Sequence, residues 1–148
     1  VAYVMSGYQG AAAYAISLDA KGDVGDKLIW KHDRGTPYVP SPLLVGNRLY
    51  FTQSNDPLLT CLDVRTGKAL IDRARLPGLT SLYASPVSAA GRIYVTGRDG
   101  TTLVLKQADQ IELLATNRLD DPIDASPVVA GKQLFLRGEK FLYCIEGK

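Results

Sequence analysis

Three segments of the chain share one pattern, in which a Ser-Pro pair is followed by an apolar run, a glycine turn and a second apolar run. They read Ser41-Pro42-Leu43-Leu44-Val45-Gly46-Asn47-Arg48-Leu49-Tyr50, then Ser85-Pro86-Val87 leading to Gly91-Arg92-Ile93-Tyr94, then Ser126-Pro127-Val128-Val129-Ala130-Gly131-Lys132-Gln133-Leu134-Phe135. The second serine follows the first by 44 residues, and the third follows the second by 41. A period of about 40 to 45 residues is the length of a four-stranded propeller blade, although some helical repeats have similar periods.

The residues within each unit decide between strands and helices. Apolar and polar residues alternate at the period of a strand, and no long stretch has the helical period. In the second unit, strands expected at 48–52 and 58–62 flank the turn-forming residues 53–57. In the third unit, Asp99 and Gly100 form an Asp-Gly pair, a strong hairpin signal because glycine accepts a positive φ. The predicted fold class is therefore all-β.

The prolines favour a β-propeller over a sandwich. Proline donates no hydrogen bond to a sheet and so belongs on an edge strand. Pro42, Pro86 and Pro127 all fall in the first strand of a unit, which in a propeller is the edge that lines the central channel. The prediction is a propeller of four-stranded antiparallel blades, with about two complete and two partial blades in this chain.

The four blades are expected at about 1–33, 36–74, 80–117 and 122–148. The first lacks an inner strand and the last lacks an outer one. Open blades expose unpaired edges and apolar faces, which is an aggregation hazard. We therefore expect the chain either to belong to a longer natural protein or to complete a ring by self-association.

The segment Cys61-Leu62-Asp63-Val64-Arg65-Thr66-Gly67-Lys68, together with the Ser-Pro pattern, resembles the pyrroloquinoline-quinone-like propeller repeat. The likeness covers essentially the whole chain. The tryptophan of the family repeat is Trp30 in the first blade, but Ile71 stands there in the second, and Leu114 or a neighbour in the third. Residues expected to have structural roles in the repeat are Trp30, Ser41, Pro42, Asp63, Thr66, Gly67, Ser85, Pro86, Asp99, Gly100, Ser126 and Pro127.

The resemblance also bears on location and chemistry. Segments 30–38 and 142–145 are similar to the C-terminal end of bacterial secreted propeller proteins, which implies a periplasmic or extracellular location. Quinoprotein dehydrogenases of this family hold Ca²⁺ and carry a disulfide of adjacent cysteines over the quinone. The two cysteines, Cys61 and Cys144, instead occupy the same repeat position in blades two apart, too far for a disulfide. Both are expected to be buried thiols.

Other candidate catalytic or metal-binding residues have simpler explanations. His32 is the only histidine, so a zinc site or a catalytic triad would lack partners, and it is expected in a loop after Trp30. The acidic residues of segment 120–124 do not have the spacing of a Ca²⁺ loop and fit a turn between blades. No catalytic residue, metal site or cofactor is predicted.

A polar contact patch is predicted near the mouth of the channel. Counting back two positions from each Ser-Pro serine aligns Val39, Tyr83 and Asp124. The patch consists of Tyr83 and Asp124 with Arg34 and Arg118 from the entry loops. The alternative is that these four residues are ordinary polar surface.

Composition limits the partners. The 148 residues are 46% hydrophobic and 22% charged, with a formal net charge of +2. This charge is small and scattered, so no nucleic-acid partner is expected, and no apolar run is long enough for a membrane span.

The leading interpretation is a non-catalytic propeller module for protein interaction or scaffolding, exported in a bacterium, with a protein partner or a second copy completing the ring. The first alternative is a fragment of a divergent quinoprotein dehydrogenase. The second alternative is a propeller that binds carbohydrate or another small ligand at the channel mouth.

Overall fold

The protein folds into fourteen β-strands arranged in four antiparallel sheets, as seen in a computed structural model that describes residues 1–147. The first sheet contains β1 (Ala2–Ser6), β2 (Ala12–Ile16) and β3 (Leu28–His32), and the second contains β4 (Leu43–Val45), β5 (Arg48–Thr52), β6 (Leu58–Asp63) and β7 (Ala69–Arg75). The third contains β8 (Val87–Ala89), β9 (Arg92–Thr96), β10 (Thr101–Lys106) and β11 (Leu113–Arg118), and the fourth contains β12 (Val128–Ala130), β13 (Gln133–Arg137) and β14 (Leu142–Glu146). The described residues hold one helical turn, Gly25–Lys27, and none of their helices could cross a membrane.

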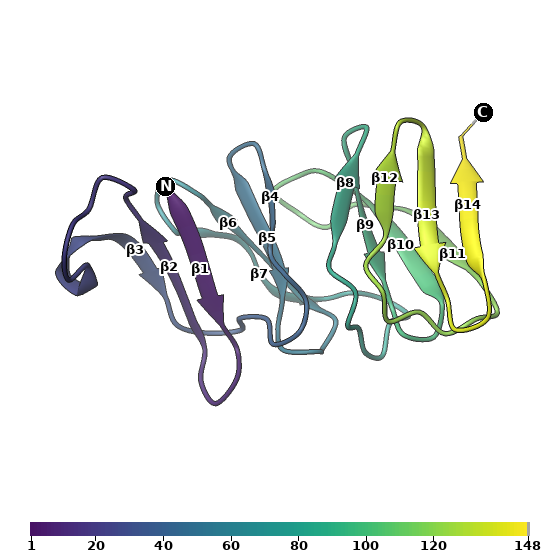
Figure 1. Cartoon of the computed structure of the whole chain (residues 1–148), viewed down its shortest axis with the longest axis horizontal. Coiled ribbons are helices and arrows are strands. Elements are labelled where there is room, and N and C mark those ends of the chain that lie inside the picture. The colour runs from purple at the N-terminus through teal and green to yellow at the C-terminus, as the bar shows by residue number, and fades with distance from the viewer. Residues whose placement is uncertain (148) are drawn as a thin grey trace.

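The four sheets are successive blades of a β-propeller. They follow one another in chain order along the molecule, and within each sheet every strand pairs with the next strand in sequence (Figure 1). The innermost strands β4, β8 and β12 contact one another in turn. The prediction of an all-β propeller with two complete and two partial blades is confirmed.

The Ser-Pro pairs link the blades at the channel. Strands β4, β8 and β12 each begin one residue after the proline, so the prolines precede these strands rather than lie inside them. The Ser85 hydroxyl accepts a hydrogen bond from the Ser41 amide at 2.9 Å, and the Ser126 hydroxyl accepts one from the Ser85 amide at 2.9 Å. Each of these two hydroxyls therefore ties its own blade to the preceding one.

Trp30 packs between the first two blades. Its indole nitrogen donates to the Val64 carbonyl at 2.8 Å, and its ring stacks on Tyr3 with centroids 5.8 Å apart. A Cβ on Gly67 would lie 2.8 Å from Trp30 Cδ2, so only glycine fits under the ring. The turn at 63–67 is shaped by the Asp63 carboxylate, which accepts bonds from the amides of Arg65 and Thr66, both at 3.0 Å. The hydrogen bond from the Thr66 hydroxyl lowers the pKa of the Asp63 carboxyl. Burial acts to raise this pKa, but its effect is smaller, so the pKa stays below its usual value.

The residue at the position of Trp30 becomes smaller in each successive blade. Three residues occupy equivalent positions in the outer strands of the first three blades, namely Trp30, Ile71 and Ala115. Their partners in the neighbouring strand are Ala15, Cys61 and Val104, respectively. Ile71 packs in a buried apolar cluster between the second and third blades. Between the third and fourth blades there is a cavity of about 580 Å³, lined by residues that include Tyr94, Leu134 and Leu136.

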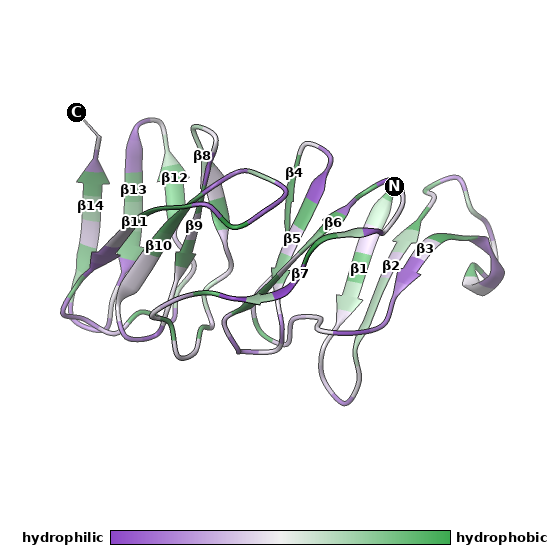
Figure 2. Cartoon of the chain, turned by 180° about the vertical axis from the view of Figure 1, so that it is seen from behind, coloured by the Kyte–Doolittle hydropathy of each residue, from purple (hydrophilic) through white to green (hydrophobic). Residues whose placement is uncertain are grey.

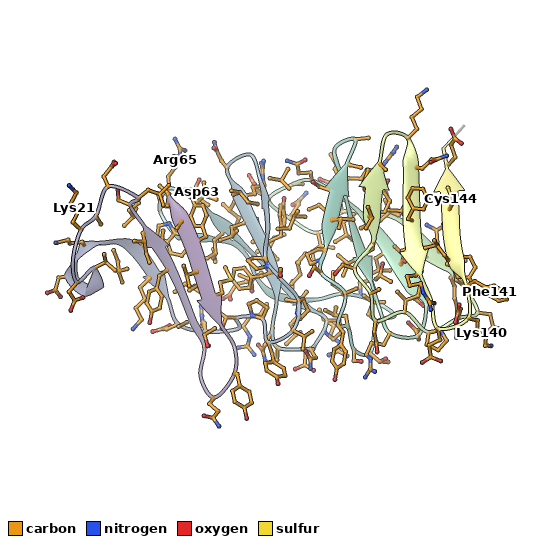
Figure 3. The ribbon with its side chains drawn as sticks, viewed as in Figure 1. Lys21, Asp63, Arg65, Lys140, Phe141 and Cys144 are labelled. Carbon is orange, nitrogen blue, oxygen red and sulfur yellow. The ribbon has the colours of Figure 1, made fainter. Side chains whose placement is uncertain are left out.

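The outer face of the last blade is apolar and uncovered. Val128 is 58% exposed and Leu142 is 66% exposed, and Cys144 is also exposed. Cys144 and Phe141 lie at the far end of the molecule, and hydrophobic residues colour much of β12 and β14 (Figures 2 and 3). The expectation that both thiols are buried is therefore wrong for Cys144, because no sheet packs on this face. It is right for Cys61.

His32 also differs from expectation. It is the last residue of β3 rather than a loop residue, it is half-buried, and its ring meets Phe51 edge to face with centroids 5.9 Å apart. It therefore packs between the first two blades.

Candidate functional site

One end of the propeller is built from the loops that enter the blades, and we call it the loop face. It is the lower side in Figure 1. There, the hairpins joining the second and third strands of each blade meet the linkers that lead into the next blade. The Arg98 amide donates to the Ser81 carbonyl of the incoming linker at 3.1 Å, and the Arg98 carbonyl accepts from the Ile123 amide of the outgoing linker at 3.1 Å. Hairpins and linkers therefore form a continuous, hydrogen-bonded surface.

Tyr83 and Asp124, two residues of the predicted patch, are joined on the loop face by Arg98. The Arg98 guanidinium lies 4.1 Å from the centre of the Tyr83 ring, and its Nε and Nη2 atoms donate to the two Asp124 oxygens at 2.6 and 3.0 Å. The Asp124 hydrogen bond raises the pKa of Arg98. Sequence reasoning missed Arg98, although it stands beside the Asp99-Gly100 turn that the hairpin signal identified.

The other two predicted residues lie apart from this trio. Arg34 donates to Asp72 of β7 at 2.8 Å. Arg118 is the last residue of β11, the outer strand of the third blade, where it pairs with Thr101. The four predicted residues thus lie in three places, and only Tyr83 and Asp124 share a direct partner.

Asp121 is a buried carboxylate that joins the third blade to the fourth. It is 1% exposed, and its oxygens accept hydrogen bonds from the amides of Lys140 and Phe141 at 3.0 to 3.1 Å and from the Tyr143 hydroxyl at 3.1 Å. Burial acts to raise the pKa of Asp121, but these hydrogen bonds outweigh it and the pKa is lowered. The carboxylate also lies directly against Gly138, where a side chain would collide with it. The segment predicted as a turn thus contains an anchor for the last hairpin.

The residues present do not fit the quinone and calcium site implied by the repeat. The family disulfide needs adjacent cysteines, whereas Cys61 lies in β6 of the second blade and Cys144 in β14 of the fourth. Among residues 1–147, no three His, Cys, Asp or Glu side chains are grouped so as to hold a metal ion. We therefore assign no chemical step to that cofactor.

Solved structures share this fold at low sequence identity. BamB from Moraxella catarrhalis has a TM-score of 0.71 at 18% identity, over 97% of this chain and 42% of that chain. The computationally designed Ika4 protein has a TM-score of 0.68 at 16% identity, over 97% of this chain and 84% of that chain. A europium-containing methanol dehydrogenase has a TM-score of 0.57 at 16% identity, over 78% of this chain and 22% of that chain. No model of a protein family and no curated protein sequence matches the chain.

These likenesses establish the propeller fold and nothing finer. The chain spans less than half of the BamB chain and less than a quarter of the methanol dehydrogenase chain. It spans most of the designed Ika4 chain, so the same arrangement of blades occurs in a chain of similar length. At these sequence identities, the shared fold does not assign an activity to this protein.

Proposed function

We propose that this chain is a non-catalytic propeller module whose function is protein interaction, and that its first partner is a second copy of itself. The observation that carries the proposal is the uncovered face of the last blade. Large apolar side chains at such positions are a signature of interaction surfaces. A second copy fits as the partner because this face has the same residue pattern as a face that is buried between two blades of the chain.

The uncovered face has a buried counterpart within the chain. In the second blade, Tyr50 pairs with Leu43 and Cys61, and this face packs on the third blade. In the last blade, Phe135 pairs in the same way with Val128 and Cys144. The exposed face therefore has the residue pattern of a surface that receives the next blade.

The first blade offers the matching half of this interface. Val4 pairs with Tyr14 on the outward face of this blade, and Val4 is 49% exposed. The equivalent pair in the second blade, Phe51 and Thr60, is buried against the first blade. The two halves of a blade-to-blade contact thus lie at opposite ends of one chain. If the last blade of each copy packs on the first blade of the other, two copies make a ring of eight sheets, which is within the usual size of propellers.

The mass in solution tests this proposal. Light scattering on the purified chain is expected to give twice 16.0 kDa at micromolar concentration. The variant Leu142→Asp, which adds a charge to the face, is expected to be a monomer of 16.0 kDa with unchanged circular dichroism. Its control is Leu18→Asp, since Leu18 is also exposed but lies between β2 and β3. A folded wild-type monomer, or equal masses for the two variants, would contradict the proposal.

Thiol labelling provides a second prediction at the same face. Burial raises the pKa of the Cys61 thiol to about 11, so this thiol is protected from reagents at neutral pH. Cys144 is exposed in the single chain but would be covered in the pair. We expect one thiol per chain to react in dilute protein and none in concentrated protein. The variant Cys61→Ala should behave in the same way, because alanine occupies this repeat position at Ala15, and labelling that does not depend on concentration would refute the pairing.

We place this module outside the bacterial cytoplasm, in the periplasm or beyond the cell. Support for this location comes from the resemblance of segments 30–38 and 142–145 to secreted propeller proteins. Scaffolding in that setting would use the loop face, which the ring leaves open.

A further inference from the structure

The loop face contains a polar cavity of about 380 Å³ between the first two blades. Its lining comes from three sources: the β1–β2 hairpin, the linker at 33–36, and the second blade. Four of the lining residues have long or charged polar side chains, namely Asp33, Arg34, Gln53 and Arg73. The volume falls in the range of small-molecule sites, and the polar groups converge from elements distant in sequence.

The backbone around this cavity is strained. Four non-glycine residues in the described part of the chain have a left-handed φ. Two of them line the cavity: Ser54, with a φ of 47°, and Arg73, with a φ of 50°. A third, Gln9 at 55°, lies in the adjoining hairpin. Such conformations persist where the surrounding structure enforces them, and they concentrate at ligand sites.

The Arg73 side chain, which lines the cavity, is held in place by its neighbours. Its Nε donates to Gln53 Oε1 at 2.6 Å, which leaves its terminal nitrogens outside this bond. Its stem crosses Gly35, where a Cβ would lie 3.1 Å from the arginine Cδ. Arg34, in contrast, is neutralised by Asp72. Asp33 and Arg73 both line the cavity and have opposite charges, so the lining has donors and acceptors but little net charge.

Two stacked tyrosines belong to the segments that line the cavity, although neither is itself a lining residue: Tyr8 follows Gly7, and Tyr38 lies two residues after Thr36. The rings of Tyr8 and Tyr38 have centroids 5.3 Å apart and an interplanar angle of 25°, yet these side chains are 64% and 52% exposed. Thr36 fixes their elements together, because its hydroxyl donates to the Ser6 carbonyl at 2.6 Å and accepts from the Ala12 amide at 3.2 Å. The same two segments therefore contribute an exposed pair of aromatic rings and part of a polar pocket.

We propose that this cavity binds a neutral saccharide. A sugar ring has an apolar C–H face that suits an exposed aromatic ring and a hydroxyl edge that both donates and accepts hydrogen bonds. Arg73 would donate to the hydroxyls, and Asp33 and Gln53 would complete the edge. A proline-rich peptide also docks on tyrosines, but in grooves lined with aromatic rings rather than beside four hydrogen-bonding side chains.

The test uses maltotriose, cellotriose and chitotriose as probes, with binding followed by heteronuclear NMR. At least one is expected to bind saturably at millimolar concentration or below, with shifts centred on residues 7–11 and 33–38. Tyr8→Ala, Tyr38→Ala and Arg73→Asn should each weaken binding about tenfold. Asparagine is chosen because it tolerates the left-handed conformation.

The matched control is Tyr83→Ala, which removes a tyrosine from the same face but at the Arg98 site. It should leave saccharide affinity unchanged. Loss of binding in Tyr83→Ala alone would move the site to the patch predicted from sequence and overturn this proposal. Failure of all three sugars to bind, or saturable binding at these residues of a proline-rich peptide but of none of the sugars, would also overturn it. None of these outcomes depends on self-association, so none of them would contradict the proposed protein-interaction function.

Discussion

Replacing Trp30 by alanine is expected to lower the free energy of unfolding by about 3–5 kcal/mol, the usual cost of emptying a large aromatic site in a core. Such a loss takes a large share of the 5–15 kcal/mol typical of a domain. The ring contributes in two ways, because it fills the space over Gly67 and its nitrogen satisfies the Val64 carbonyl. Alanine loses both contributions and leaves the buried Val64 carbonyl with only the longer hydrogen bond from the Tyr3 hydroxyl, at 3.4 Å.

Chemical denaturation followed by circular dichroism measures this effect. Trp30→Phe is the matched control, since it keeps most of the ring but not the hydrogen bond, and it should cost about 1–3 kcal/mol. Trp30 is the only tryptophan, so its fluorescence reports the contact directly in the wild type. A loss below about 1 kcal/mol for Trp30→Ala would mean that the first two blades are held by other contacts.

The strands could be predicted because their signals are local. Alternation at 48–52 and the turn residues at 53–57 predicted the bounds of β5 directly. The Asp-Gly hairpin was equally local, since Gly100 has a φ of 84° and the Asp99 carboxylate accepts from the Thr101 hydroxyl at 2.9 Å. The repeat then set the order of the blades without any knowledge of distant contacts.

The candidate sites could be predicted only in part because they depend on contacts between distant segments. Alignment of the repeats brought Tyr83 and Asp124 to the loop face, but the bridging Arg98 belongs to a hairpin that the alignment did not consider. The stack of Tyr8 on Tyr38 joins a hairpin to a linker 30 residues away. Similarly, Cys144 and Cys61 occupy one repeat position and differ only in whether another blade covers them. No pattern in a single segment contains that information.

Asp121→Asn is expected to lower the melting temperature by several degrees at neutral pH. Two amides and one hydroxyl converge on the carboxylate. Asparagine presents one acceptor and one donor in the place of two acceptors, so at least one of these donors loses its partner. The last hairpin would then detach first, and hydrogen exchange at 139–143 should rise more than exchange in β5 and β6.

Acid should erase the difference between this variant and the wild type. The folded pKa of Asp121 is lowered from 3.8, so the carboxylate contributes its full stability above that value and loses it as the pH falls through the lower, folded value. Melting temperatures of wild type and Asp121→Asn should therefore differ at pH 7 and converge below pH 3.8. Asp120→Asn, at the exposed neighbouring position, is the control and should follow the wild type throughout. A gap that persists unchanged into acid would show that Asp121 acts through its shape and not through its charge, because only a charged acceptor loses its contribution on protonation.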